Sequence, residues 1–331
     1  MMTLRTLYRN LILAALILTL GVVSLGAYVR LSDAGLGCPD WPGCYGKLTP
    51  HHAADAINAE LAERPGGPVS HAKAWKEMVH RYAAGILGLL VLGIAVLGWR
   101  GRRETAGGPG LPVLLLGLIV FQALLGMWTV TQLLKPLVVT SHLLGGLATL
   151  SLLLWLWLRE RGRASHAYFA RVDHLRAGAT LGLLLVIAQI ALGGWVSSNY
   201  AALACTDFPL CQGVWMPPMD FEHSFTLHRE LGETVAGDLL PMAALTAIHW
   251  VHRVMALIVT VYLGWLVLRL LRTPGYAGMG MIVGGLLVLQ VALGIGNVLL
   301  SLPLALAVAH NGGAALLLAS LVWLNYRVRR R

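Results

Sequence analysis

The stretch GAYVRLSDAGLGC (residues 26–38) has a counterpart, GGWVSSNYAALAC (residues 193–205), which begins 167 residues further along the chain. Both stretches start with Gly, place an aromatic residue and a Val in the same register, and end in Cys. A second Cys follows each of them, at Cys44 and Cys211, and keeps the same offset. Matches at a fixed offset indicate an internal repeat, and each half must then form the same structural unit.

The repeat continues beyond these stretches, with small changes of offset that fit insertions in loops. The further matches pair Gln122, Gly126 and His142 with Gln290, Gly294 and His310 at an offset of 168, and His80-Arg81 with His252-Arg253 at an offset of 172. We therefore expect an N-terminal half, residues 1–165, and a C-terminal half, residues 166–331.

The composition is that of an integral membrane protein. Of the 331 residues 57% are hydrophobic and 12% charged, and the mean hydropathy is +0.71, whereas soluble domains carry about 25% charged residues. Eight apolar runs approach the length of a spanning helix, ~20 residues. They lie at 11–30, 80–99, 111–133, 137–158, 177–197, 247–268, 278–300 and 304–325. The first run is long for a signal peptide, so we expect it to be retained.

Lys and Arg predict the orientation of these spans. With the N-terminus in the cytoplasm, the inner segments hold 16 of the 25 basic residues, all of them Arg, and three of the 15 acidic ones. The inner Arg residues are Arg5, Arg9, Arg100, Arg102, Arg103, Arg159, Arg161, Arg163, Arg171, Arg176, Arg269, Arg272, Arg327, Arg329, Arg330 and Arg331. Both termini are then cytoplasmic, and the long loops 31–74 and 198–246 are outside. Because the positive charge is explained by topology, we expect no nucleic-acid partner.

Four spans per half is an even number, so both halves have the same orientation and their symmetry axis runs along the membrane normal. The expected fold is all-α, with eight transmembrane helices forming two tandem, pseudo-twofold-related four-helix bundles. Bundle cores hold cofactors between side chains of facing helices.

Four His residues recur in the repeat: His80, His142, His252 and His310. Each lies near the outer end of an even-numbered span, so each half offers two imidazoles at similar depth. Two His ligands complete a six-coordinate haem iron, and small residues after the His, as in Gly145-Gly146, let a flat macrocycle approach the backbone. The alternatives are His side chains hydrogen-bonded at the interface and a Zn or Cu site, which lacks further Cys or carboxylate ligands in both halves.

The halves differ beside these His residues. Glu77 lies three residues before His80, on the same helix face, whereas His249 lies three residues before His252. A carboxylate can act as a general base or stabilise positive charge, which predicts chemistry in the N-terminal half and a resident redox centre in the C-terminal half. The alternative for the carboxylate is a surface ion pair with Lys73, Lys76 or Arg81.

Arg81 and Arg253 directly follow their His residues. Their guanidinium groups can pair with haem propionates or extend to the membrane interface.

All four Cys lie in the outer loops, as the pairs Cys38/Cys44 and Cys205/Cys211. Disulfides persist outside the cytoplasm, so we expect each loop to close on itself, as a structural link or as a redox-active dithiol.

Five motifs together resemble the haem A synthase family, of the bacterial type with outer-loop cysteine pairs. They are GAYVRLSDAGLGCPDWPGC (26–44), EMVHR (77–81), TSHLLGG (140–146), IHWVHR (248–253) and AHNGG (309–313). The resemblance covers nearly the whole chain, and it implies that the protein lies in the bacterial cytoplasmic membrane.

The resemblance implies oxidation of haem O to haem A, the cofactor of terminal cytochrome oxidases. The C8 methyl of the ring becomes a formyl group through two hydroxylations and loss of water. By carry-over, His252 and His310 ligate a resident haem B, His80 and His142 face haem O or its product haem A, and Glu77 is catalytic. Haem O synthase is the expected substrate donor, and a short helix expected within residues 51–74 would cover the site or contact that donor.

A bis-His di-haem electron-transfer cytochrome is the alternative function. It uses the same His residues but needs no Glu77, and it normally places one haem near each membrane face. A transporter built on a repeat fits less well, because its site would lie at mid-membrane between broken helices.

Glycines such as Gly85 and Gly88 suit packing within a protomer and homo-oligomer formation equally. The electron-transfer partner and the oxygen source stay open.

Overall fold

A computed structural model of the chain describes residues 3–102, 105, 108–162 and 173–329. In this part of the chain the regular structure is helical, and eight helices are long and apolar enough to cross a membrane. The predicted spans are confirmed, and the protein is a multi-pass membrane protein. The expected boundary between residues 165 and 166 lies outside the described residues, as do Arg103, Arg163, Arg171, Arg330 and Arg331.

The chain divides into two compact units, Met1–Thr149 and Leu150–Arg331. The division falls inside helix α5 (Pro136–Gly162), so the first part of this helix belongs to unit 1 and its last part to unit 2. Each unit is described by itself.

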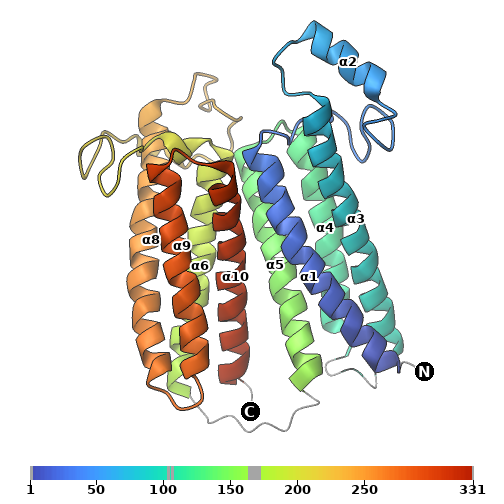
Figure 1. The fold of residues 1–331 in the computed structure, drawn as a ribbon, viewed down its shortest axis with the longest axis vertical. Coiled ribbons are helices and arrows are strands. Elements are labelled where there is room, and N and C mark those ends of the chain that lie inside the picture. The colour runs from blue at the N-terminus through green and yellow to red at the C-terminus, as the bar shows by residue number, and fades with distance from the viewer. Residues whose placement is uncertain (1–2, 103–104, 106–107, 163–172, 330–331) are drawn as a thin grey trace. The chain divides into compact units, whose positions relative to one another are not determined.

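Unit 1 is built from α1 (Leu4–Leu31), α3 (His71–Arg100), α4 (Gly110–Thr131) and the first half of α5. Helix α3 packs between α1 and α4, while α5 approaches α4 at Gly145 and α1 at Gly146 (Figure 1). A buried stripe with helical spacing, Tyr8, Ile12 and Ala15, forms the inner face of α1. The outer faces of these helices are apolar and exposed, as lipid requires.

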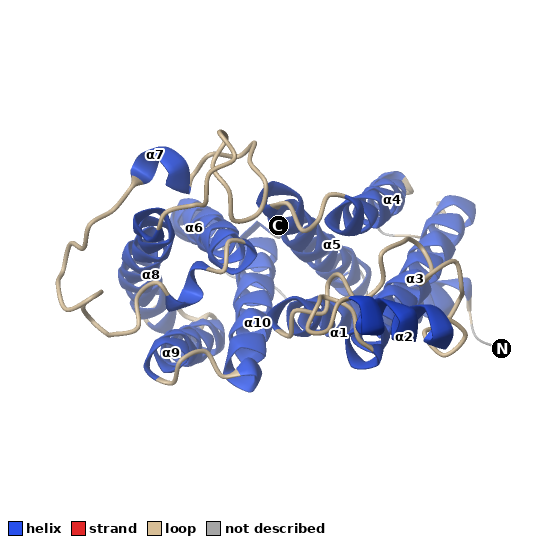
Figure 2. Ribbon diagram, turned by 90° about the horizontal axis from the view of Figure 1, so that it is seen from above, coloured by secondary structure: helices blue, strands red, loops and turns tan. Residues whose placement is uncertain are grey.

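Unit 2 contains α6 (Asp173–Ser198), α8 (Met242–Leu271), α9 (Ala277–Leu299) and α10 (Leu304–Arg329). Each of these helices packs against two neighbours, in the cyclic order α6, α8, α9, α10, which is visible from above in Figure 2. This is a closed four-helix bundle.

Helix α3 begins nine residues before the apolar run that predicts it. Ser70 has extended backbone, and its hydroxyl accepts the N–H of Lys73 at 3.2 Å, which is a standard N-cap. Hydropathy records only the lipid-embedded part of a helix. As a result Glu77 and His80 lie about two turns inside the helix, where neighbouring elements can surround them.

The two long loops between the helices carry most of the remaining structure. In unit 1 the expected short helix is confirmed as α2 (Ala54–Glu63), and its Ile57 is fully buried in a cluster with Cys38 and Cys44. Unit 2 has the short helices η1 (Ala201–Leu203) and α7 (Phe221–Ser224). Disulfides join Cys38 to Cys44 and Cys205 to Cys211, so each loop closes on itself as expected.

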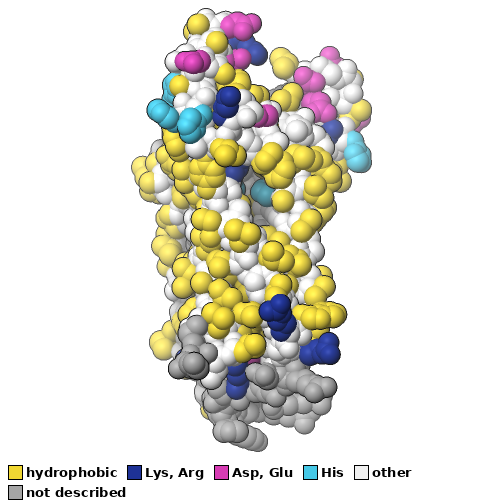
Figure 3. All heavy atoms as spheres, turned by 90° about the vertical axis from the view of Figure 1, so that its right-hand side faces the viewer, with side chains coloured by type: hydrophobic (Ala, Val, Ile, Leu, Met, Phe, Trp, Pro, Cys, Tyr) yellow, Lys and Arg dark blue, Asp and Glu magenta, His cyan; other side chains and the backbone are white. Residues whose placement is uncertain are grey.

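The surface has an apolar middle and a polar end at the loops. On the face shown in Figure 3, hydrophobic side chains cover the middle, and most Asp, Glu and His side chains gather at the end that carries the loops. An apolar band bounded by polar ends is the pattern of a bilayer-embedded surface.

The packing of α1, α3 and α4 can be tested at Gly98, where the three helices meet. A Cβ at Gly98 would lie 3.0 Å from Pro112 and 3.2 Å from the hydroxyl of the fully buried Tyr8. We expect Gly98→Val to lower the free energy of unfolding by about 1–3 kcal/mol, because neither neighbour can yield. Thermal unfolding in detergent measures the change.

The matched control is Gly88→Val on the same helix, since no atom lies within 4 Å of a Cβ at Gly88. Equal melting temperatures for the two variants would contradict the packing described for Gly98.

Candidate functional site

Each unit brings two of the repeated His residues together. In unit 1, His80 on α3 and His142 on α5 lie close enough to interact electrostatically. In unit 2, His252 on α8 and His310 on α10 do the same. The repeat therefore supplies one His pair per unit, in the helices and at the helix positions that the sequence predicts.

A glycine of a neighbouring helix makes room for each of these rings. A Cβ on that glycine would lie 3.0 to 3.4 Å from the ring's Cε1 atom, tighter than ordinary contacts. The glycine and His pairs are Gly26 with His80, Gly126 with His142, Gly193 with His252, and Gly294 with His310. These are the glycines that mark the repeat in the sequence. Each glycine recurs in the repeat, as its His does, and this was the signal in the sequence that could have linked the two. The sequence alone does not show whether such a glycine contacts a His side chain or only lets two helices pack closely.

Three of the four rings have a buried nitrogen that makes no hydrogen bond within the described part of the chain. The Nδ1 atoms of His80, His142 and His310 are buried and have no hydrogen-bond partner among the described residues. The ring of His252 contacts the amide nitrogen of Gln189, 3.1 Å from Nδ1 and 3.3 Å from Nε2. A buried polar atom without a partner requires an explanation. Neutral imidazoles beside small residues fit the axial ligation of a haem, which needs only two protein ligands.

Gln122 and Gln290 complete the repeat around the second His of each pair. Gln290 donates from Nε2 to the main-chain oxygen of His310 at 2.9 Å. The amides of these two Gln residues occupy the space that a side chain at Gly145 or Gly313 would fill. Because both glycines stand three residues after the His, the glycine pairs in TSHLLGG and AHNGG serve helix packing as well as any approach of a macrocycle.

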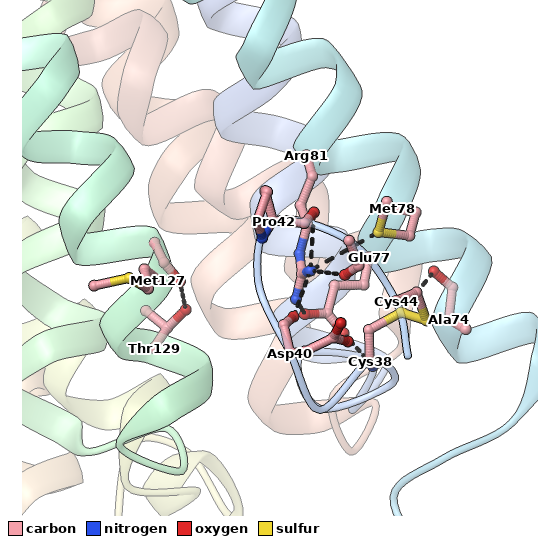
Figure 4. A network of polar contacts seen from close by, with 12 residues as sticks. Cys38, Asp40, Pro42, Cys44, Ala74, Glu77, Met78, Arg81, Met127 and Thr129 are labelled. Atoms are coloured by element: carbon pink, nitrogen blue, oxygen red, sulfur yellow. Dashed lines mark hydrogen bonds and ion pairs between the residues drawn. A yellow bond between two sulfur atoms is a disulfide. The ribbon is translucent and has the colours of Figure 1, made fainter. Parts of the chain in front are cut away.

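Glu77 lies in a charged network within unit 1 and is 4% exposed. One carboxylate oxygen pairs with Arg81 at 2.5 Å, and the other accepts the N–H of Cys38 at 3.0 Å (Figure 4). Of the three basic neighbours considered from the sequence, Arg81 is thus the partner, while Lys76 lies over the ring of Tyr28 at 5.0 Å. The pair is buried, unlike a surface ion pair.

Arg81 also connects α3 to the first cysteine loop. Its Nη1 atom donates to the carbonyl oxygens of Asp40 at 2.8 Å, Pro42 at 3.3 Å and Gly43 at 2.5 Å. Figure 4 shows the guanidinium group directed into this loop. The loop contacts are visible in the structure, whereas pairing with a propionate stays a prediction.

Unit 2 repeats this arrangement with a different neighbour. Arg253 donates to the carbonyl oxygens of Cys205, Asp207 and Leu210 at 2.8–2.9 Å. Its Nε atom donates to Nε2 of His249 at 3.2 Å, so His249 occupies the place that Glu77 has in unit 1. The two units share the Arg and the loop carbonyls, and they differ in the charge beside them.

An aspartate fixes each cysteine loop. Asp40 accepts the N–H groups of Tyr45 and Gly46, both at 2.6 Å, and Asp207 accepts those of Gln212 and Gly213 at 2.7 and 2.8 Å. The Gly213 N–H, followed by that of Gln212, holds the pKa of the Asp207 carboxyl below its usual range. These aspartates keep the 167-residue offset, which is the signal in the sequence that could have identified them.

Comparison with known proteins places the chain in a family. A family model described as cytochrome oxidase assembly protein, COX15-CtaA, matches residues 9–322. The haem A synthase of Shewanella oneidensis is 47% identical over 94% of this chain and 93% of its own length. The haem A synthases of Rhizorhabdus wittichii and Methylobacterium radiotolerans are 28% and 31% identical, over 96% and 89% of this chain and 92% and 82% of their own lengths.

A match over nearly the whole chain, together with a relative at almost half identity over the same span, leaves one conclusion: the chain belongs to the COX15-CtaA family of cytochrome oxidase assembly proteins.

Proposed function

We propose that this protein is a haem A synthase, an oxidoreductase that converts haem O to haem A. The observation that carries the proposal is the pair of half-buried imidazoles in each unit, every ring lying against a glycine. The name of the 47% identical relative supports it. The reaction oxidises the C8 methyl of the substrate to a formyl group by two hydroxylations, and the resulting geminal diol loses water.

The two units would have different roles, one binding the substrate and the other a resident cofactor. In the proposed arrangement His80 and His142 face haem O in unit 1, and His252 and His310 hold a resident haem B in unit 2. Haem B, when bound, supplies one-electron redox chemistry. Among the described residues a carboxylate lies three positions before the first His of the pair in unit 1, at Glu77, and an imidazole lies there in unit 2, at His249. This asymmetry supports placing the oxidation in unit 1.

Glu77 would act at the reacting edge of the substrate. One of its oxygens pairs with Arg81 and the other accepts the N–H of Cys38, so the carboxyl group is fixed in position. A fixed negative charge stabilises positive charge that develops on the substrate. Arg81 and Arg253 would hold the outer loops over the two haem sites and pair with propionates through their remaining N–H groups.

The same reasoning extends to location and partners. The protein would lie in the bacterial cytoplasmic membrane with its haem sites near the outer face. Haem O synthase would supply the substrate, and α2, which packs on the first cysteine loop, is the proposed contact surface for it.

Haem extraction tests the proposal directly. The protein is expressed in membranes that contain haem O and purified, and the extracted haems are separated by chromatography with mass detection. We expect haem B together with haem O, its alcohol or haem A. Haem B alone would indicate the electron-transfer cytochrome, and absence of all haem would reject both functions.

The role of Glu77 has a separate test. We expect Glu77→Gln to slow conversion of haem O by roughly 100-fold or more, the scale of a lost catalytic proton-transfer or charge-stabilising group. Conversion is followed in purified protein supplied with haem O and reductant.

Glu60→Gln is the matched control, because Glu60 pairs with Arg64 at 2.8 Å on α2, away from the His residues. Normal turnover in Glu77→Gln would remove this carboxylate from the mechanism and leave the di-haem cytochrome as the better description.

The proposed topology predicts the side of each loop. Alkaline phosphatase, which is active only outside the cytoplasm, should be active when fused after residue 236 and inactive when fused after residue 329. Fluorescent protein fusions at the same positions should give the reverse pattern. The opposite result at either position would overturn the assignment of cytoplasmic termini.

A further inference from the structure

The backbone of Gly37 lies unusually close to helix α3. A Cβ at this position would lie 2.6 Å from the carbonyl carbon of Lys73, 2.7 Å from the nitrogen of Ala74 and 2.8 Å from the oxygen of Lys73. All three atoms belong to the main chain of a helix and cannot turn aside as a side-chain end can. Any side chain at position 37 would therefore move the cysteine loop away from α3.

This close approach brings the loop to Glu77. The next residue, Cys38, donates its N–H to the Glu77 carboxylate at 3.0 Å. Arg81 pairs with the same carboxylate and donates to three carbonyl oxygens of the loop. Figure 4 shows the Cys38–Cys44 loop, Glu77 and Arg81 as one connected group.

The second unit provides the comparison. Position 204 corresponds to Gly37 at the 167-residue offset and holds Ala, in the sequence LAC (203–205) against LGC (36–38). In unit 2 the residue that corresponds to Glu77 is His249, which contacts Arg253. Hence the loop that must reach a carboxylate has Gly, and the loop without a carboxylate to reach has a side chain.

We propose that Gly37 is a positioning residue for Glu77: its missing side chain lets the Cys38–Cys44 loop lie on α3 and hold the carboxylate through the backbone N–H of Cys38. This inference rests on the proposed function for the role of Glu77, but the loop contact itself does not depend on any haem. Displacement of a reacting group by about 1 Å can lower a rate on the order of 100-fold.

The test uses the full-length protein with Gly37→Ala and, as the matched control, Ala204→Gly. We expect Gly37→Ala to lower kcat for haem O on the order of 100-fold and to leave the Kd for haem O unchanged in a Soret titration. Ala204→Gly should leave both unchanged. The double variant Gly37→Ala/Glu77→Gln should be as slow as Glu77→Gln alone, because residues that act through one another do not add.

A second readout needs no haem. Dithiothreitol reduction of the two disulfides is followed by alkylation and mass spectrometry, with Cys205–Cys211 as the internal reference. Because Cys38 and Cys44 are buried against α2 and α3, we expect both Gly37→Ala and Glu77→Gln to accelerate reduction of Cys38–Cys44 several-fold and to leave Cys205–Cys211 unchanged.

Each outcome decides the inference. Wild-type kcat in Gly37→Ala, or multiplying losses in the double variant, would overturn it. Unchanged reduction of Cys38–Cys44 in Glu77→Gln would also overturn it, even if Gly37→Ala failed to fold. If wild-type protein neither binds nor converts haem O while the reduction rates change as expected, the proposed function fails and the loop contact stands.

Discussion

Burial of polar side chains inside an apolar helix bundle is the constraint on which the rest of this structure depends. An unpartnered polar group in a lipid-embedded bundle costs several kcal/mol. Each unit nevertheless holds two half-buried imidazoles, and in three of these rings a buried Nδ1 has no partner among the described residues. Glycines on neighbouring helices make the room for them. A ligand bound between the rings would offset this cost, and in this way the fold supports the proposal for the site.

The asymmetry between the units is small in sequence and large in charge. Arg81 and Arg253 both bond to loop carbonyls, and the loops are closed by equivalent disulfides and aspartates. The scaffold is therefore shared, and what changes is the carboxylate of Glu77 against the imidazole of His249. On this shared frame, the difference between Glu77 and His249 gives the Arg of unit 1 a carboxylate partner and the Arg of unit 2 an imidazole partner.

Much of this was accessible from the sequence, because it depends on local or periodic signals. Hydropathy predicted all eight spans, and the offsets predicted the His pairs and the cysteine loops. The start of α3 was missed by nine residues, because its first turns are polar and their signal is the cap at Ser70. The partners of Arg81 could not be predicted. They are backbone oxygens some 40 residues away in the chain, and no side-chain pattern marks a carbonyl as an acceptor.

The two disulfide-closed loops belong to the site and are more than connections between helices. In each unit the helix supplies an Arg, and the loop supplies several carbonyl oxygens that converge on it. Carbonyls can converge in this way only if the loop is held in one conformation. A disulfide restricts the unfolded loop, while an aspartate accepts two loop N–H groups. The repeated Cys and Asp residues thus secure the position of the helix residues that flank the His pairs, and in unit 1 these residues include Glu77.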